Sequence, residues 1–151
     1  MGFLSADTQK QIKQLFESLS SDVDLTYYTQ RESPLFIPGR ADCETCKDTR
    51  QLLEEVAALS DKLKLSVKEL DDVGEAGREH GIDRVPALVV GAEGVKGKIR
   101  YFGMPSGTEF PVLLGSLIDA SQGKSDLSES SIEALQLLDQ DMHIQVFVTP
   151  T

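Results

Sequence analysis

The 151-residue sequence contains no tryptophan, only 2 cysteines and 2 histidines, and far fewer basic than acidic residues. Two cysteines cannot support a disulfide-rich scaffold. The net charge of −10 argues against binding to nucleic acids or to anionic membranes. No apolar run is long enough to cross a bilayer, and the first residues do not have the pattern of a secretory signal. Because 40% of the residues are hydrophobic, we expect a folded domain with a real core, located in the cytoplasm.

Hydrophobic spacing predicts alternating helices and strands. Residues 31–42 carry two prolines and a glycine and indicate a loop, and Ser130 with Glu133 is a candidate capping box. We expect helices over 5–20, 44–63, 72–80, 108–120 and 128–138, and strands over 23–30, 64–70, 85–90, 99–102 and 144–148. A strand, a helix and a strand in succession favour parallel pairing, and the next two strands favour a hairpin. The sequence therefore predicts an α/β domain with a four-stranded mixed sheet and helices on both faces.

The two cysteines lie three residues apart, at the start of the predicted helix over 44–63. Unpaired N–H groups and the dipole at a helix start favour a thiolate, so we expect Cys43 to attack and Cys46, one turn on, to resolve. Cys43 should also be the more exposed thiol. A metal site would need two further ligands, which His80 and His143 do not supply as a pair. An inert pair of small buried side chains is the other alternative.

A second motif joins Val85 to Pro86 at the start of a predicted buried strand. A proline at this position, after a turn at Gly81, fits a cis peptide bond. Such a bond would turn the Val85 main chain outward beside the cysteines, where its N–H and C=O could pair with an extended substrate segment. A trans proline at a strand edge is the alternative. Val85 and Pro86 are therefore the candidate substrate-binding residues.

This order of a strand, Cys43-x-x-Cys46, a proline before a buried strand, a hairpin and a helix resembles the thioredoxin superfamily. Residues 82–87, 100–110 and 139–151 resemble more closely the N-terminal unit of the tandem, glutaredoxin-like protein disulfide oxidoreductases, whose chains hold two thioredoxin-fold units. The Gly-Gly-x-x-Asp element of glutathione-using glutaredoxins is missing after the hairpin. The sequence departs from the tandem family by a longer segment over 31–42 and by ending where the family continues into a second Cys-x-x-Cys.

The resemblance implies a thioredoxin-fold unit over 1–122, and a linker helix with the first strand of a missing second unit over 123–151. The predicted strand over 144–148 is apolar on both faces, and no lysine or arginine occurs from residue 125 onward to protect an exposed edge. An isolated strand leaves main-chain groups unpaired. We therefore expect it to pair with the unit's own sheet or with a second copy of the chain, giving a homodimer.

The function implied is a dithiol–disulfide oxidoreductase module that exchanges protein disulfides through Cys43 and Cys46, with no bound cofactor and no metal. Its partners would be disulfide-containing proteins, and a flavoprotein of the thioredoxin reductase type would supply electrons. The alternative is a non-catalytic unit that binds substrate or scaffolds the second unit, with idle cysteines.

Overall fold

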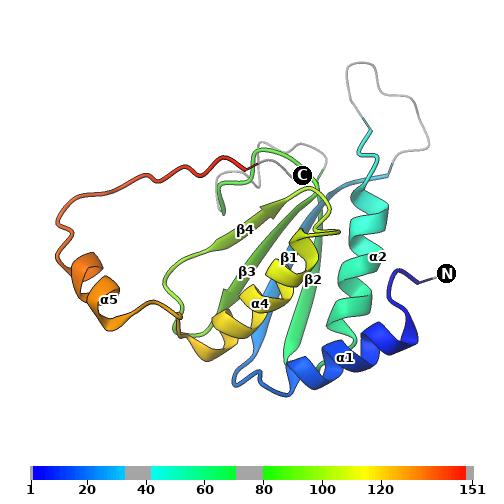
Figure 1. The fold of residues 1–151 in the computed structure, drawn as a ribbon. Helices are drawn as coiled ribbons and strands as arrows, with labels where there is room; N and C mark the ends of the chain where they lie inside the picture. The colour runs from blue at the N-terminus through cyan, green and yellow to red at the C-terminus, as the bar shows by residue number, and fades with distance from the viewer. Residues whose placement is uncertain (1, 33–41, 71–79, 149–151) are drawn as a thin grey trace.

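The computed structural model describes residues 2–32, 42–70 and 80–148 (Figure 1). Most of the predicted helix over 72–80 and most of the predicted loop over 31–42 lie outside these residues. The helices and strands are α1 (Ala6–Phe16), β1 (Val23–Gln30), α2 (Cys46–Ala57), β2 (Leu63–Leu70), β3 (Ala87–Ala92), β4 (Ile99–Phe102), α4 (Glu109–Gln122) and α5 (Glu129–Gln136).

The strands form one sheet in the order β2-β1-β3-β4. β1 pairs parallel with β2, with Val23 opposite Leu63, and antiparallel with β3, with Tyr28 opposite Ala87. β3 and β4 form the antiparallel hairpin. The predicted four-stranded mixed sheet is confirmed. β1 is an inner strand of this sheet. The segment that follows β1 therefore begins at a strand that is hydrogen-bonded to a neighbour on each side.

Alternation along β1 divides the core between the two faces of the sheet. Val23, Leu25 and Tyr27 belong to a cluster that receives buried side chains from α1, α2 and α4, among them Phe16, Leu53 and Leu117. Tyr28, on the opposite face, packs with Ile82, Ala87 and Val89. The three helices therefore cover one face, as Figure 1 shows for α2 and α4. Helices on both faces were expected, and most of the predicted helix over 72–80 lies outside the described residues, so a helix on the second face stays a prediction.

Two of the helices begin at a serine cap. The Ser5 hydroxyl accepts a hydrogen bond from the Thr8 N–H at the start of α1, and the Ser128 hydroxyl accepts one from the Ser131 N–H at the start of α5. Ser128 has the extended backbone of a capping residue, whereas Ser130 already lies inside the helix. The predicted capping box at Ser130 is therefore wrong by two residues.

The predicted strand over 144–148 is not formed. These residues have no regular structure, and Ile144, Val146 and Phe147 are each more than three-quarters exposed. α5 contributes no buried residue, so no packing directs the segment onto an edge of the sheet. Pairing with the unit's own sheet, one of the two expected outcomes, is therefore wrong for the described residues. Within the parts of the chain that the structure describes, no helix combines the length and apolarity needed to cross a membrane.

Candidate functional site

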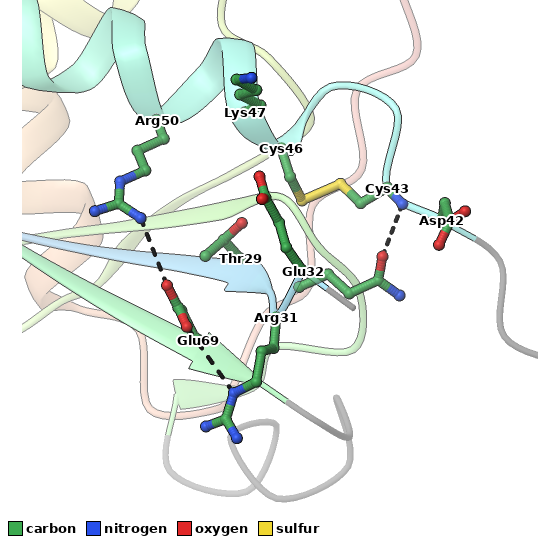
Figure 2. Close-up of a pocket in the computed structure, with 10 residues that line it drawn as sticks. Thr29, Arg31, Glu32, Asp42, Cys43, Cys46, Lys47, Arg50 and Glu69 are labelled. Carbon is green, nitrogen blue, oxygen red and sulfur yellow. Dashed lines mark hydrogen bonds and ion pairs between the residues drawn. A yellow bond between two sulfur atoms is a disulfide. The ribbon is translucent and has the colours of Figure 1, made fainter. Parts of the chain in front are cut away.

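Cys43 and Cys46 are joined by a disulfide beside the end of β1, with an S–S distance of 2.04 Å and Cα atoms 5.5 Å apart (Figure 2). Cys46 is the first residue of α2, and a turn at residues 44–45 separates it from Cys43. The helix thus begins two residues later than predicted. Cys43 is half-buried and Cys46 is 6% exposed, which confirms the expected difference in exposure. The lower pKa expected for the Cys43 thiol stays a prediction.

Side chains from β1 hold the main chain on both sides of the disulfide. The Cys43 N–H donates to Gln30 Oε1 at 2.8 Å, and the Tyr27 hydroxyl donates to the Cys46 carbonyl at 2.6 Å. The Thr49 hydroxyl donates to the Thr45 carbonyl at 2.7 Å. Sequence reasoning missed Tyr27, Gln30 and Thr49. For Tyr27 and Gln30, the only signal was a polar group on a residue of the strand predicted before the cysteines. For Thr49, it was a polar residue within the predicted helix over 44–63.

Tyr27 is a buried polar residue directly beneath the start of α2. Its side chain is fully buried, and this burial is the main cause of a pKa above the ordinary value of tyrosine. Hydrogen bonding to Thr29 and Thr49 and the charge of Arg50 act in the opposite direction. The phenol therefore keeps its proton at neutral pH and remains a hydrogen-bond donor.

An open cleft of about 480 Å³ lies beside the disulfide. It is lined by both cysteines, three cationic side chains and three carboxylates, with Thr29 and Gln30: the charged residues are Arg31, Lys47, Arg50, Glu32, Asp42 and Glu69. The three positive and three negative formal charges cancel. The net charge of the cleft therefore favours neither the thiol nor the thiolate form of the cysteines.

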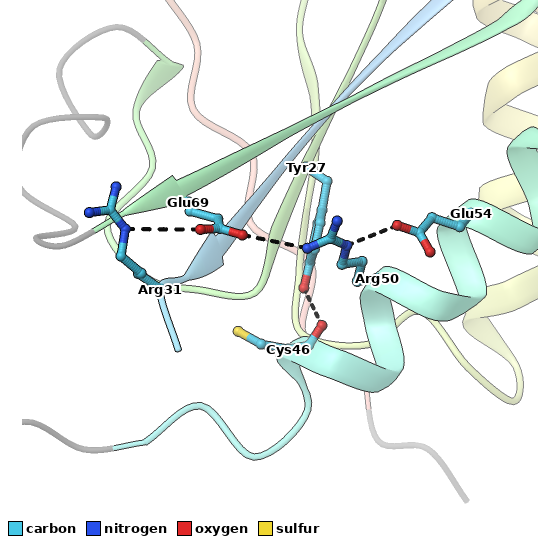
Figure 3. Close-up of polar contacts among 6 residues, drawn as sticks. All are labelled: Tyr27, Arg31, Cys46, Arg50, Glu54 and Glu69. Carbon is cyan, nitrogen blue, oxygen red and sulfur yellow. Dashed lines mark hydrogen bonds and ion pairs between the residues drawn. The ribbon is translucent and has the colours of Figure 1, made fainter. Parts of the chain in front are cut away.

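Glu69 links the two arginines across the cleft. Its carboxylate lies 3.9 Å from Arg31 Nε and 3.5 Å from an Arg50 Nη, and Arg50 Nε contacts Glu54 at 2.8 Å (Figure 3). The hydrogen bond to Glu54 is the main cause that raises the pKa of Arg50, so this side chain stays charged. All four side chains are about half exposed. Exposed ion pairs contribute little to stability, so this wall of the cleft can rearrange at low cost.

Val85 and Pro86 lie at the same end of the sheet as the cysteines. Tyr28 is opposite Ala87 and Thr29 is opposite Glu69, so the approach to β3 and the end of β2 flank the end of β1 on opposite sides. The Val85–Pro86 peptide bond is cis, as the sequence predicted. Neither residue lines the cleft described above.

The Val85 main chain is open for pairing. Among the residues that the structure describes, neither its N–H nor its C=O has a hydrogen-bond partner. Its side chain packs against the Tyr28 cluster, and the next carbonyl, that of Pro86, accepts from the Gly103 N–H at 2.9 Å. The short distance expected between the Val85 main chain and Cys43 stays a prediction.

Comparison with known proteins places these features in a family. A model described as "Thioredoxin domain" matches residues 37–114, which is more than half of the chain. The chain is 26% identical over 148 residues to the F subunit of alkyl hydroperoxide reductase in Staphylococcus aureus and 24% identical to that in Staphylococcus epidermidis. These matches cover 98% of this chain and 25% of each relative. The chain therefore spans about a quarter of the length of these relatives.

Solved structures show the same fold. The NTD_N/C domain of alkylhydroperoxide reductase AhpF from Enterococcus faecalis matches with a TM-score of 0.68 and 20% identity, over 85% of this chain and 57% of that one. A protein disulfide oxidoreductase from Aeropyrum pernix matches with a TM-score of 0.70 and 24% identity, over 89% of this chain and 55% of that one.

The chain is a thioredoxin-like unit with the fold of these structures. It belongs to the thioredoxin domain family. Family membership together with the Cys43–Cys46 disulfide gives the unit a redox role.

Proposed function

We propose that this domain carries out dithiol–disulfide exchange on protein disulfides through Cys43 and Cys46. The observation that carries the proposal is the pairing of a half-buried cysteine, ahead of a helix start, with a buried cysteine at the first helical residue. Cys43 is therefore the more exposed of the two residues, although both line the cleft. This asymmetry suits an attacking thiol and a resolving thiol.

The exchange has two steps. The Cys43 thiolate attacks one sulfur of a substrate disulfide, forms a mixed disulfide and releases the other substrate sulfur as a thiolate. The Cys46 thiolate then attacks Cys43 Sγ, forms the Cys43–Cys46 disulfide seen in the structure and releases the second substrate thiolate. Two electrons pass from the cysteine pair to the substrate, and a reductant must return the pair to the dithiol.

The source of these electrons is proposed from the relatives. The chain resembles about a quarter of the F subunit of alkyl hydroperoxide reductase, and this relation supports a domain that works with a reductase partner. We place a flavoprotein of the thioredoxin reductase type in this role. Residues 123–151 would then connect the thioredoxin-fold unit over 1–122 to a second unit.

The Val85 main chain is the proposed docking point for substrate. Its N–H and C=O, unpaired within the described chain, lie at the end of the sheet where β1 leads to the cysteines, and an extended peptide could pair with them as a short strand. A peptide trapped on Cys43 as a mixed disulfide, in the Cys46→Ser variant, should slow hydrogen exchange of the Val85 amide. Unchanged exchange at Val85 would place the substrate elsewhere.

The function is tested by the reduction of insulin disulfides with dithiothreitol as the electron source. The unaltered chain should accelerate the reaction, and Cys43→Ser should abolish the acceleration. Cys46→Ser should instead accumulate a mixed disulfide on Cys43. If the unaltered chain and Cys43→Ser behave alike, the cysteines are idle and the domain is a binding or scaffolding unit.

A further inference from the structure

The start of α2 lacks the cap that fixes the starts of α1 and α5. Thr45 occupies the capping position, but its side chain makes no capping hydrogen bond within the described chain. The first turn of a helix leaves N–H groups without intrahelical partners, and an uncapped first turn opens more readily. Cys46 is the first residue of this turn. Its position therefore depends on contacts other than a cap.

The core supplies one such contact from below. The fully buried Tyr27, on the inner strand β1, donates its hydroxyl hydrogen to the Cys46 carbonyl at 2.6 Å (Figure 3). This bond ties the main chain of the resolving cysteine to the central sheet. Because burial keeps the phenol protonated, the bond persists across the pH range in which thiols exchange.

The hydrogen bond from Tyr27 to the Cys46 carbonyl matters most when the Cys43–Cys46 disulfide is not formed. In the oxidised state, the bond between Cys43 and Cys46 itself fixes the distance between the two residues. In the mixed disulfide, Cys43 Sγ is bonded to substrate, and only the main chain keeps Cys46 within reach. A group held in reacting position reacts as though at a very high local concentration, so loss of this hold slows the step.

We propose that Tyr27 is a positioning residue that holds Cys46 against Cys43 in the mixed disulfide and thereby sets the rate of resolution. The proposal rests on the exchange function proposed above. In the step concerned, the Cys46 thiolate attacks Cys43 Sγ, a new disulfide forms, and the substrate sulfur leaves with the electron pair. Tyr27 does not touch the reacting sulfurs and acts through the main chain of Cys46.

The test separates capture from resolution with dithiobis-nitrobenzoate as the probe. Attack by Cys43 releases one thionitrobenzoate at a rate that depends on probe concentration, and resolution by Cys46 releases the second at a rate that does not. Tyr27→Phe keeps the ring and removes the donor. It should slow the second phase about five-fold, as expected for the loss of one hydrogen bond, and leave the first phase within about two-fold of the unaltered chain.

Tyr101→Phe is the matched control. The Tyr101 hydroxyl bonds to Ser116 between β4 and α4, away from the cysteines, so its loss should leave both phases unchanged. A second measurement needs no variant: the Thr49 amide, which donates to the Thr45 carbonyl in the first turn, should stay protected from hydrogen exchange when the unaltered protein is reduced.

Three results would contradict the inference: equal slowing of both phases in Tyr27→Phe, no slowing of the second phase, or loss of Thr49 protection on reduction. If the unaltered chain releases no thionitrobenzoate at all, the exchange function itself is wrong and the inference falls with it. The two failures are therefore distinguishable.

Discussion

At the scale of single residues, Glu55 of α2 has a role that its position alone does not reveal. Its carboxylate accepts hydrogen bonds from the main-chain N–H groups of Phe3 and Leu4, at 3.0 and 2.9 Å. The bond from Leu4 is the largest cause of a lowered pKa for Glu55, with further help from Gln51 and Phe3. The carboxylate thus ties the residues before α1 to α2.

We predict that Glu55 makes stability depend on pH in the acidic range. A lowered folded-state pKa means that the contribution is present above the ordinary pKa of glutamate and is lost as the pH falls through the folded-state pKa. Glu55→Gln should therefore lower the free energy of unfolding at neutral pH and flatten its fall on acidification. Urea unfolding at a series of pH values measures both effects. Glu44→Gln, at an exposed position without a partner in the described chain, is the control and should change neither.

The candidate site divides into residues that the sequence reveals and residues that only the fold reveals. Cys43 and Cys46 are evident from their spacing, and Val85 with Pro86 from a proline ahead of a buried run. Tyr27 and Gln30 are not evident, because their contacts join β1 to residues 19 and 13 positions further along the chain, and only the fold brings these residues together. A tyrosine in an apolar strand is the usual core pattern, and the partner of its hydroxyl is decided by tertiary packing.

At the scale of elements, α4 is fastened to the turn before β1 by one serine. Ser121 is 4% exposed, and its hydroxyl accepts from the N–H groups of Ser20 and Ser21 at 2.7 and 2.9 Å. The hydroxyls of Ser20 and Ser21 in turn donate to the Ser121 carbonyl. This cluster joins segments about a hundred residues apart and fixes the end of α4 against the sheet.

Ser121→Ala should destabilise the domain more than an ordinary surface change. It leaves two partly buried N–H groups without their acceptor, and we expect the free energy of unfolding to fall by about 2 kcal/mol. Thermal or urea denaturation provides the measurement. Ser131→Ala in α5, which contributes no buried residue, serves as the comparison and should have little effect. Equal effects of the two changes would mean that the serine cluster does not fasten α4.

The elements also show where sequence patterns suffice. β1 and β4 have the predicted bounds, because polar or glycine-containing segments flank both strands. α2 is shorter than predicted, since the apolar spacing continues through Leu59 and Leu63, although Leu59 follows the helix and Leu63 begins β2. Hydrophobic periodicity identifies the buried face of a helix. It does not identify the residue at which the helix ends, because that residue depends on where the next strand joins the sheet.

At the scale of the whole molecule, the described residues after α4 stand apart from the core. α5 buries nothing, and the following segment exposes a series of apolar side chains: Met142, Ile144, Val146, Phe147 and Val148. Such a segment lowers its free energy by covering these side chains. The sheet of the unit does not cover them. For the 151-residue chain on its own, we expect a second copy of the chain to cover them.

We therefore predict that the 151-residue chain associates and that a chain ending at Asp139 does not. Light scattering coupled to size exclusion should give a dimer mass for the first and a monomer mass for the second. Both should unfold at similar temperatures, because the segment after Asp139 contributes no buried side chain among the described residues. Two monomers would show that the exposed apolar segment does not mediate self-association.

The place of β1 in the sheet has a consequence for synthesis on the ribosome. β1 is made before the other strands of its sheet, yet its two neighbours end only at Leu70 and Ala92. A nascent chain that has released β1 and β2 still carries one open edge of β1, and open strand edges are where incomplete chains mispair. Cys43 and Cys46 therefore leave the ribosome well before β3 and α4 can complete the core beneath them.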